Sequence, residues 1–333
     1  NQNKSIMLNN FPIDQDILKI LHSRGIVSKK DIINFLDPSL DNIQPSSLLS
    51  DMKKSVDLII ECINNGKNIW IYGDYDVDGI TSTSILYLAL KDLGAEFLNY
   101  YIPIRDEGYG LNNTALKTIK NSGADLLITV DCGITSFKEI EFAKSIGLDV
   151  IITDHHDIQS DKIPNAYSII NPKRTDNAFT FNALAGVGVA FMLILNLYEK
   201  LKTKEEAYVY LDLVAIGTIA DIVPLVKENR IFAKHGLEKL LYSENKGLRF
   251  LITKLFETAK LEFTTYDVGF VIAPVFNAAG RLKDAKMVVK LLTSDNDREI
   301  EVISKELINK NFERRELQTT LVELVEANIQ KNN

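Results

Sequence analysis

Short apolar runs alternate with amphipathic segments of helical spacing through the first half of the sequence. The runs that we expect to be strands cover residues 68–73, 97–102, 125–130, 149–153 and 167–170. Strands that alternate with helices in this way form a parallel sheet with helices on both faces. In such sheets, ligands bind beyond the carboxyl ends of the strands. The alternation therefore predicts an α/β fold with a doubly wound, mainly parallel sheet.

The remaining sequence is mostly helical and suggests four parts. Residues 1–50 form the expected N-terminal helical cap, and residues 51–175 form the parallel-sheet domain. Residues 176–293 are expected to be its helical part, because apolar helical patterns follow one another there. Residues 294–333 carry a long charged helical pattern, interpreted as a connecting helix toward a further domain that the sequence lacks.

Composition excludes several classes of protein. The 333 residues are 46% hydrophobic and 25% charged, without an apolar run near the ~20 residues that a membrane span needs. No basic-then-apolar signal segment is present, so the expected compartment is the cytoplasm and no membrane contact is expected. Two cysteines, Cys62 and Cys132, do not suggest a disulfide framework or a thiolate cluster. The net charge of −7 argues against a globally basic surface for nucleic acid, although a local cationic groove or bound metal ions would serve.

Three carboxylates follow the first expected strand at every second position: Asp74, Asp76 and Asp78. In extended backbone, alternate residues share a face, so the three would converge and repel one another unless a cation lay among them. Gly79 would then permit a sharp turn. Residues 81–83 would open a helix whose N-terminal amides favour a phosphate. The alternative, a solvated acidic loop, is disfavoured by the residues that end two further strands.

Those strands also end in metal-binding residue types. Asp131 follows residues 125–130, and the run Asp154, His155, His156 follows residues 149–153. Three strands would thus deliver carboxylate and imidazole ligands to one sheet edge, which is how a two-metal hydrolytic site is built. Oxygen-rich ligation suits Mn²⁺ or Mg²⁺ better than Zn²⁺.

Other candidates are weaker by themselves. Asp221 closes an apolar helical run and is either a ligand or a solvated helix-terminal residue. Residues 277–281 form a small-residue loop that could close around a phosphate, or an ordinary helix end. Arg105 and Tyr109 lie in a loop past the second strand, where they would hold a phosphate and stack a base, or remain solvated. The glycines of residues 184–191 indicate helix packing.

Taken together, these motifs resemble those of the DHH phosphoesterase superfamily, specifically its RecJ branch of single-strand-specific 5′→3′ exonucleases. The resemblance covers about residues 40–315 in the family's order. The first motif, Tyr-Gly-Asp-Tyr-Asp, differs from the histidine-containing motif usual in the small-substrate branches. The residues that carry the resemblance are 74–79, 130–133, 153–156, 217–221 and 277–281.

The resemblance implies a role for each site residue. It makes Asp76, Asp78, Asp131, His155 and Asp221 the ligands of two Mn²⁺ or Mg²⁺ ions, with Asp131 between them. His156 would face the scissile phosphate, and Asp74 would support the first motif, so that Asp131, His156 and Asp74 form the catalytic set. The implied substrate contacts are Arg105 and Arg281 to a terminal 5′-phosphate, with Tyr109, Asn277 and Gly280 beside the strand.

The implied function is a two-metal-ion exonuclease that removes 5′-mononucleotides from single-stranded DNA in repair and recombination. Its implied partners are a free 5′ end, single-stranded-DNA-binding protein and a helicase. One alternative is a DHH phosphodiesterase acting on short oligonucleotides, cyclic dinucleotides or pyrophosphate. Another is a non-catalytic scaffold that binds DNA or replication proteins and would lack ligand carboxylates. Because family members continue into further domains, we interpret the chain as a catalytic-core fragment with weak activity of its own.

Overall fold

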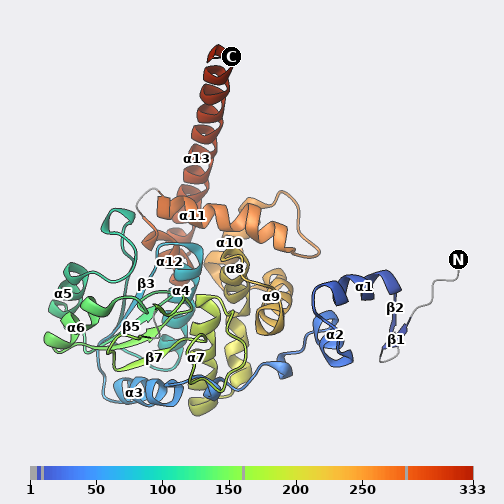
Figure 1. Ribbon diagram of the computed structural model, residues 1–333. Coiled ribbons are helices and arrows are strands. Elements are labelled where there is room, and N and C mark those ends of the chain that lie inside the picture. The colour runs from blue at the N-terminus through green and yellow to red at the C-terminus, as the bar shows by residue number, and fades with distance from the viewer. Residues whose placement is uncertain (1–5, 9–10, 160–161, 282–283, 333) are drawn as a thin grey trace, which may run out of the picture.

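A five-stranded parallel sheet is the centre of the computed structural model, which describes residues 6–8, 11–159, 162–281 and 284–332 (Figure 1). The strand order is β4-β3-β5-β6-β7, and every neighbouring pair is parallel. The strands are β3 (Ile69–Gly73), β4 (Leu98–Tyr101), β5 (Leu126–Val130), β6 (Asp149–Thr153) and β7 (Ser168–Ile170). The predicted fold class is confirmed.

The register places the ends of the central strands level with one another. Gly73 pairs with Val130, and Val130 pairs with Thr153. The chain leaves β3 for β4 on one side and later returns to β5 on the other, so the order reverses beside β3. Ligand sites of parallel sheets lie at such a reversal, beyond the carboxyl ends of the strands.

Helices cover both faces of the sheet, as Figure 1 shows. On one face, α3 (Met52–Asn64), α4 (Val77–Asp92) and α7 (Gly186–Leu201) share a core with Ile71 and Ile128. On the other, α5 (Asn113–Asn121) and α6 (Phe137–Ser145) share a core with Tyr72 and Leu127. Because successive strand residues point to opposite faces, a strand covered on both sides is apolar throughout.

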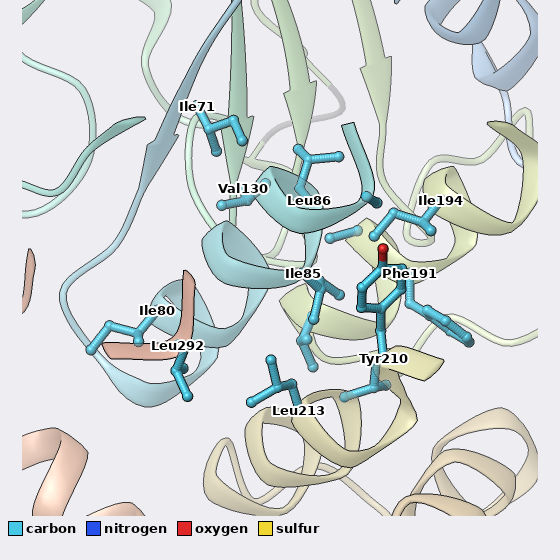
Figure 2. Close-up of a cluster of buried hydrophobic side chains, with 14 of the residues drawn as sticks. Ile71, Ile80, Ile85, Leu86, Val130, Phe191, Ile194, Tyr210, Leu213 and Leu292 are labelled. Carbon is cyan, nitrogen blue, oxygen red and sulfur yellow. The ribbon is translucent and has the colours of Figure 1, made fainter. Parts of the chain in front are cut away.

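The helical part of the chain packs onto α4. Figure 2 shows Ile85 of α4 close to Phe191 and Leu213, which lie on α7 and α8. Each such fully buried side chain stabilises the fold by about 1.5–3 kcal/mol relative to exposure. The further helices are α8 (Leu211–Ala220), α9 (Lys227–Lys239), α10 (Lys246–Leu255), a π-helical turn (Asp267–Ile272), α11 (Ala273–Arg281) and α12 (Lys286–Thr293).

Both ends of the chain depart from this body. At the C-terminal end, α13 (Asp297–Asn332) buries Ile300 and Leu307 and then projects away, leaving Phe312 exposed (Figure 1). At the N-terminal end, the described elements are α1 (Gln15–Ser23), α2 (Lys29–Leu36) and a short antiparallel ribbon of β1 (Ile6–Leu8) and β2 (Phe11–Ile13). The sequence patterns did not predict this ribbon.

The N-terminal segment contacts the body through α9. The Arg230 guanidinium lies 3.6 Å from the centre of the Phe35 ring, and Lys234 forms an ion pair with Asp37 at 2.9 Å. Within the part of the chain that the structure describes, no helix is both long enough and apolar enough to cross a membrane.

Candidate metal centre

The acidic segment after β3 is the start of a helix. Asp76 is the N-cap of α4, and its Oδ1 accepts a hydrogen bond from the Gly79 amide at 3.0 Å. Aspartate is a preferred N-cap, so the chain turns into a helix at Val77 and Asp78 lies in the first turn. The expectation that Asp74, Asp76 and Asp78 converge through extended backbone is therefore wrong.

Two related expectations are also wrong. Gly79 lies inside α4, where a Cβ would stand 2.6 Å from the Asp74 amide nitrogen, so close packing rather than a turn requires glycine there. Residues 81–83 are buried within the helix, beyond its N-terminal turn. The hydroxyls of Thr81 and Thr83 donate to the carbonyls of Val77 and Gly79, each at 2.8 Å.

The carboxylate of Asp78 is held by the N-terminus of α7. The amides of Gly186 and Val187 donate to its two oxygens at 2.6 and 2.7 Å. A Cβ on Gly186 would also lie 2.6 Å from Asp131 Oδ1. The sequence pattern indicated only helix packing for these glycines, and their place beside two carboxylates was missed; a glycine at the start of an apolar helix was the available signal.

Asp131 follows β5 directly and is buried. Its φ of +60° lies in the left-handed region, which costs a non-glycine residue roughly 1–2 kcal/mol. Its amide donates to the Thr153 carbonyl at 3.0 Å, which ties this bend to the end of β6. Its Oδ1 lies 3.1 Å from His155 Nε2.

Asp154 organises the two histidines that follow β6. It accepts hydrogen bonds from the amides of Ile134, His155 and His156, and from His156 Nδ1 at 2.7 Å. Burial alone would raise the pKa of Asp154, but these hydrogen bonds, led by the one from His156, lower it. The same hydrogen bond raises the pKa of His156. Asp154 was quoted in the motif but not named as a site residue; its short spacing to the histidines was the signal.

All seven expected ligand and catalytic side chains come together. Asp221, at the end of α8, reaches His155 Nδ1 at 3.7 Å, and Asp78 lies 3.8 Å from His155 Nε2. Three overlapping groups each place their ligand atoms within 4.8 Å of one another: Asp131, His155 and His156; Asp78, His155 and Asp221; Asp74, Asp76 and Asp131. One cluster thus collects residues from both halves of the chain.

Crowding and burial change the protonation of this cluster. Burial, followed by the charge of Asp76, raises the pKa of Asp74 and of Asp78 to about 7. Burial, followed by the charge of Asp78, raises the pKa of Asp221 to about 7, and the pKa of Asp131 also lies well above its ordinary value. Burial lowers the pKa of His155. A cation at this point would reverse the carboxyl shifts.

The donor set fits a hard divalent cation. Buried atoms that lack a hydrogen-bond partner among the described residues include Asp74 Oδ1, Asp131 Oδ1, His155 Nε2 and Asp221 Oδ2. Buried polar atoms of this kind are costly unless something binds them. Carboxylate oxygens with one or two imidazoles match Mn²⁺ or Mg²⁺.

The expected substrate residues lie to one side of this cluster. The Arg105 guanidinium is 5.6 Å from the centre of the Tyr75 ring, and a Cβ on Gly280 would stand 2.6 Å from the Tyr75 carbonyl. The Tyr109 hydroxyl donates to the Asp131 carbonyl at 3.2 Å and lies 3.1 Å from His156 Nδ1. We call the surface formed by Tyr75, Arg105 and Gly280 the Tyr75 flank.

Of the two interpretations of residues 277–281, the structure shows the helix end and not the loop. Asn277 and Gly280 lie within α11, because its alanines favour a helix and its glycine allows close approach to Tyr75. Asn277 is half-buried. Arg281 ends α11, but its side chain falls outside the described part of the structure.

Comparison with known proteins agrees with this fold. Residues 68–218 match the DHH family, N-terminal domain, which defines the class of protein. A crystal structure of exonuclease RecJ bound to manganese is 36% identical, with a TM-score of 0.75, over 83% of this chain and 69% of that one. RecJ in complex with Mn²⁺ from Thermus thermophilus is 34% identical over 91% of this chain and 42% of that one, with a TM-score of 0.77. The chain therefore belongs to the RecJ family.

Curated relatives extend beyond the matched region. The single-stranded-DNA-specific exonuclease RecJ of Bacillus subtilis strain 168 is 40% identical over 93% of this chain but only 39% of its own length. The Escherichia coli K12 protein of the same name is 37% identical over 90% of this chain and 53% of its own length. The chain thus spans about half the length of these relatives, or less.

Proposed function

We propose that this chain is the catalytic part of a metal-dependent phosphodiesterase, a 5′→3′ exonuclease that acts on single-stranded DNA and releases 5′-mononucleotides. The observation that carries the proposal is the single cluster of Asp74, Asp76, Asp78, Asp131, His155, His156 and Asp221, with unpartnered buried oxygens among the described residues. The relatives that share this region are named as single-stranded-DNA-specific exonucleases.

Five residues would hold two Mn²⁺ or Mg²⁺ ions: Asp76, Asp78, Asp131, His155 and Asp221. Asp131 belongs to two of the three groups of ligand atoms. When bound, the ions supply activation of a water molecule and stabilisation of the negative charge that develops at phosphorus. The amides of Gly186 and Val187 keep Asp78 in place, and Asp154 keeps the adjacent histidines in place. These contacts pre-organise the carboxylates before substrate arrives.

His156 is the group that faces the scissile phosphate in this proposal. Its hydrogen bond to Asp154 raises its pKa, which favours the imidazolium form, and in that form Nε2 carries a proton that can be donated to a phosphate oxygen. Asp74, buried beside Asp76, accepts a proton or a hydrogen bond in support of the first motif. Asp131, His156 and Asp74 form the proposed catalytic set.

In this proposal, the protein binds the substrate by its 5′ end. Arg105 and Arg281 bind the terminal phosphate, and Tyr109 lies alongside the first nucleotide, with Asn277 and Gly280 next to it. Guanidinium groups suit a terminal phosphate because they donate two parallel hydrogen bonds. We further propose that residues 51–293 act as the catalytic unit, in the cytoplasm, in repair and recombination together with single-stranded-DNA-binding protein and a helicase.

The test measures nucleotide release from strands labelled at either end in Mn²⁺ buffer. We expect mononucleotides from the 5′ end, and Asp131→Asn should reduce turnover at least about a hundredfold without unfolding the protein. The control is Asp149→Asn, an exposed aspartate at the opposite end of β6.

Three results would contradict the proposal. Wild-type turnover by Asp131→Asn would refute the site. Cleavage of dinucleotides but not long strands would indicate the short-substrate branch. A lack of calorimetric Mn²⁺ binding and of hydrolysis would indicate a scaffold.

A further inference from the structure

A cavity of about 840 Å³ adjoins the metal centre on the side of His155 and Asp221. Its volume lies within the ~300–1,000 Å³ of typical ligand pockets. Its lining combines polar side chains such as Lys173, Thr175 and Asn182, the carboxylates of Asp157 and Asp176, and apolar side chains such as Ile158, Val223 and Pro224. A lining of mixed character suits a nucleotide, which presents a charged phosphate and an apolar base face.

The cavity and the Tyr75 flank lie toward opposite ends of the strand order. Tyr75 and Arg105 follow β3 and β4, whereas the cavity residues His155 and Lys173 follow β6 and β7. Among the described residues, the cavity wall includes His155, His156 and Asp221 but none of Arg105, Tyr109, Asn277 and Gly280. The ligand cluster therefore lies between two surfaces that could each contact a nucleic acid.

Of the lysine and arginine side chains in the described cavity wall, Lys173 and Arg174, only Lys173 is available. Arg174 is fully engaged by Asp51, Asp176 and the Ile169 carbonyl, at 2.6–2.7 Å. Lys173 Nζ contacts Asp157 at 2.8 Å, and the Asp157 side chain is 90% exposed. Ion pairs with so exposed a partner contribute little, so a phosphate can replace the carboxylate. The Lys173 backbone is fixed by its hydrogen bond to Asn171 Oδ1.

We propose that this cavity receives the part of the strand on the 3′ side of the scissile phosphate. Lys173 binds the phosphate that follows the scissile one, and Ile158, Val223 and Pro224 contact the base. The inference depends on the proposed function: if the 5′ end is held on the Tyr75 flank and the scissile phosphate at the ligands, the strand must continue to the opposite side. The Tyr75 flank and the cavity together then determine the 5′-to-3′ direction of the bound strand.

The experiment compares 5′-phosphorylated oligothymidylates that carry one neutral methylphosphonate linkage. The rate of removal of the first nucleotide, kcat/KM, is measured for wild type, Lys173→Gln and a control, Lys144→Gln, an exposed lysine in the last turn of α6. For wild type, neutralising the linkage after the scissile one should reduce kcat/KM about tenfold, the value of one charge-assisted hydrogen bond. For Lys173→Gln, neutralising the same linkage should leave kcat/KM unchanged, because this variant already lacks the contact with that phosphate.

The 5′-terminal phosphate and the Lys144→Gln variant serve as internal references for the effect of Lys173. Removing the 5′-terminal phosphate should reduce kcat/KM by the same factor in wild type and Lys173→Gln, and the control should behave as wild type throughout. If Lys173→Gln instead removes the effect of the 5′-terminal phosphate, the strand lies in the opposite direction. If Lys173→Gln loses the same factor as wild type at every linkage, the cavity does not hold the strand.

A binding measurement separates this inference from the proposed function. If wild type hydrolyses none of the strands, the proposed function fails, and affinity is then measured by fluorescence anisotropy in EDTA at several salt concentrations. Each phosphate contact on a single strand contributes a slope of about −0.7 to log affinity against log salt. Lys173→Gln should reduce the steepness of the slope by about 0.7, and an unchanged slope overturns the inference.

Discussion

Gly186→Ala should damage the metal centre through one methyl group. A Cβ at this position would lie 2.6 Å from Asp131 Oδ1 and 2.7 Å from Asp131 Cβ, where ordinary contacts begin at 3.4 Å. The Asp131 carboxylate would therefore have to move by about 0.8 Å, the difference between 3.4 and 2.6 Å. Alanine keeps the amide that donates to Asp78, and Gly186 lacks a positive φ, so the effect is steric.

Two quantities follow from this displacement. A misplacement near 1 Å at a catalytic group reduces turnover about a hundredfold, and overpacking a buried site destabilises a protein by about 1–3 kcal/mol. Single-turnover hydrolysis of a labelled strand measures the loss of turnover, and calorimetric titration measures the affinity for Mn²⁺. Urea unfolding monitored by circular dichroism measures the loss of stability.

Gly188→Ala is the matched control, two residues further along α7. Its nearest atom would be Leu184 Cδ2 at 3.3 Å, at the end of a flexible side chain that can move. We expect wild-type Mn²⁺ affinity and turnover from this variant. If folded Gly186→Ala also retained wild-type Mn²⁺ affinity and turnover, the inference that Gly186 packs tightly against Asp131 would be wrong.

Three further predictions concern pH, buried hydrogen bonds and backbone strain. Because burial and neighbouring charges raise the folded-state pKa of Asp74 and Asp221 to about 7, above an ordinary value near 3.9, the metal-free folded protein binds more protons than the unfolded chain between about pH 4 and 7. Its melting temperature in EDTA should fall as pH rises through that window, and Mn²⁺ should raise it more at about pH 8 than at about pH 5; a metal-free melting temperature that rises with pH would contradict the shifts. Asp154→Ala removes the acceptor of three backbone amides and His156 Nδ1 and should destabilise the protein by about 3 kcal/mol in urea, whereas a loss below about 1 kcal/mol would show that water replaces the carboxylate. Ile222 has a φ of +62° and is 88% exposed, so Ile222→Asn should stabilise the protein by about 1 kcal/mol, and a loss of stability would mean that Ile222 makes contacts that its exposure conceals.

The strands and their shared edge were predictable because the apolar runs are uninterrupted. A strand covered on both faces has few polar residues until it ends, so residues 125–130 point to Asp131, and residues 149–153 point to Asp154 and His155. Parallel strands then bring those ends together without further information. The ribbon at the N-terminus was missed because each of its strands has only three residues.

Local choices at the site were harder to predict. The alternation of aspartates suggested extended backbone, but an aspartate N-cap begins a helix in the same sequence. The small residues before Arg281 were compatible with a loop or a helix end, and in the structure they form a helix that approaches Tyr75 closely. The contact of Gly186 with Asp78 joins residues far apart in sequence, and no local pattern encodes such a pairing.

The hydrogen bonds from the start of α7 to Asp78 have a consequence for synthesis of the protein. Asp78 leaves the ribosome 108 residues before Gly186, and Asp221 comes later still. A nascent or prematurely terminated chain would expose Asp78 without the two amides that hold its carboxylate. The ligand cluster would therefore be complete only after the second half of the chain has docked onto the sheet.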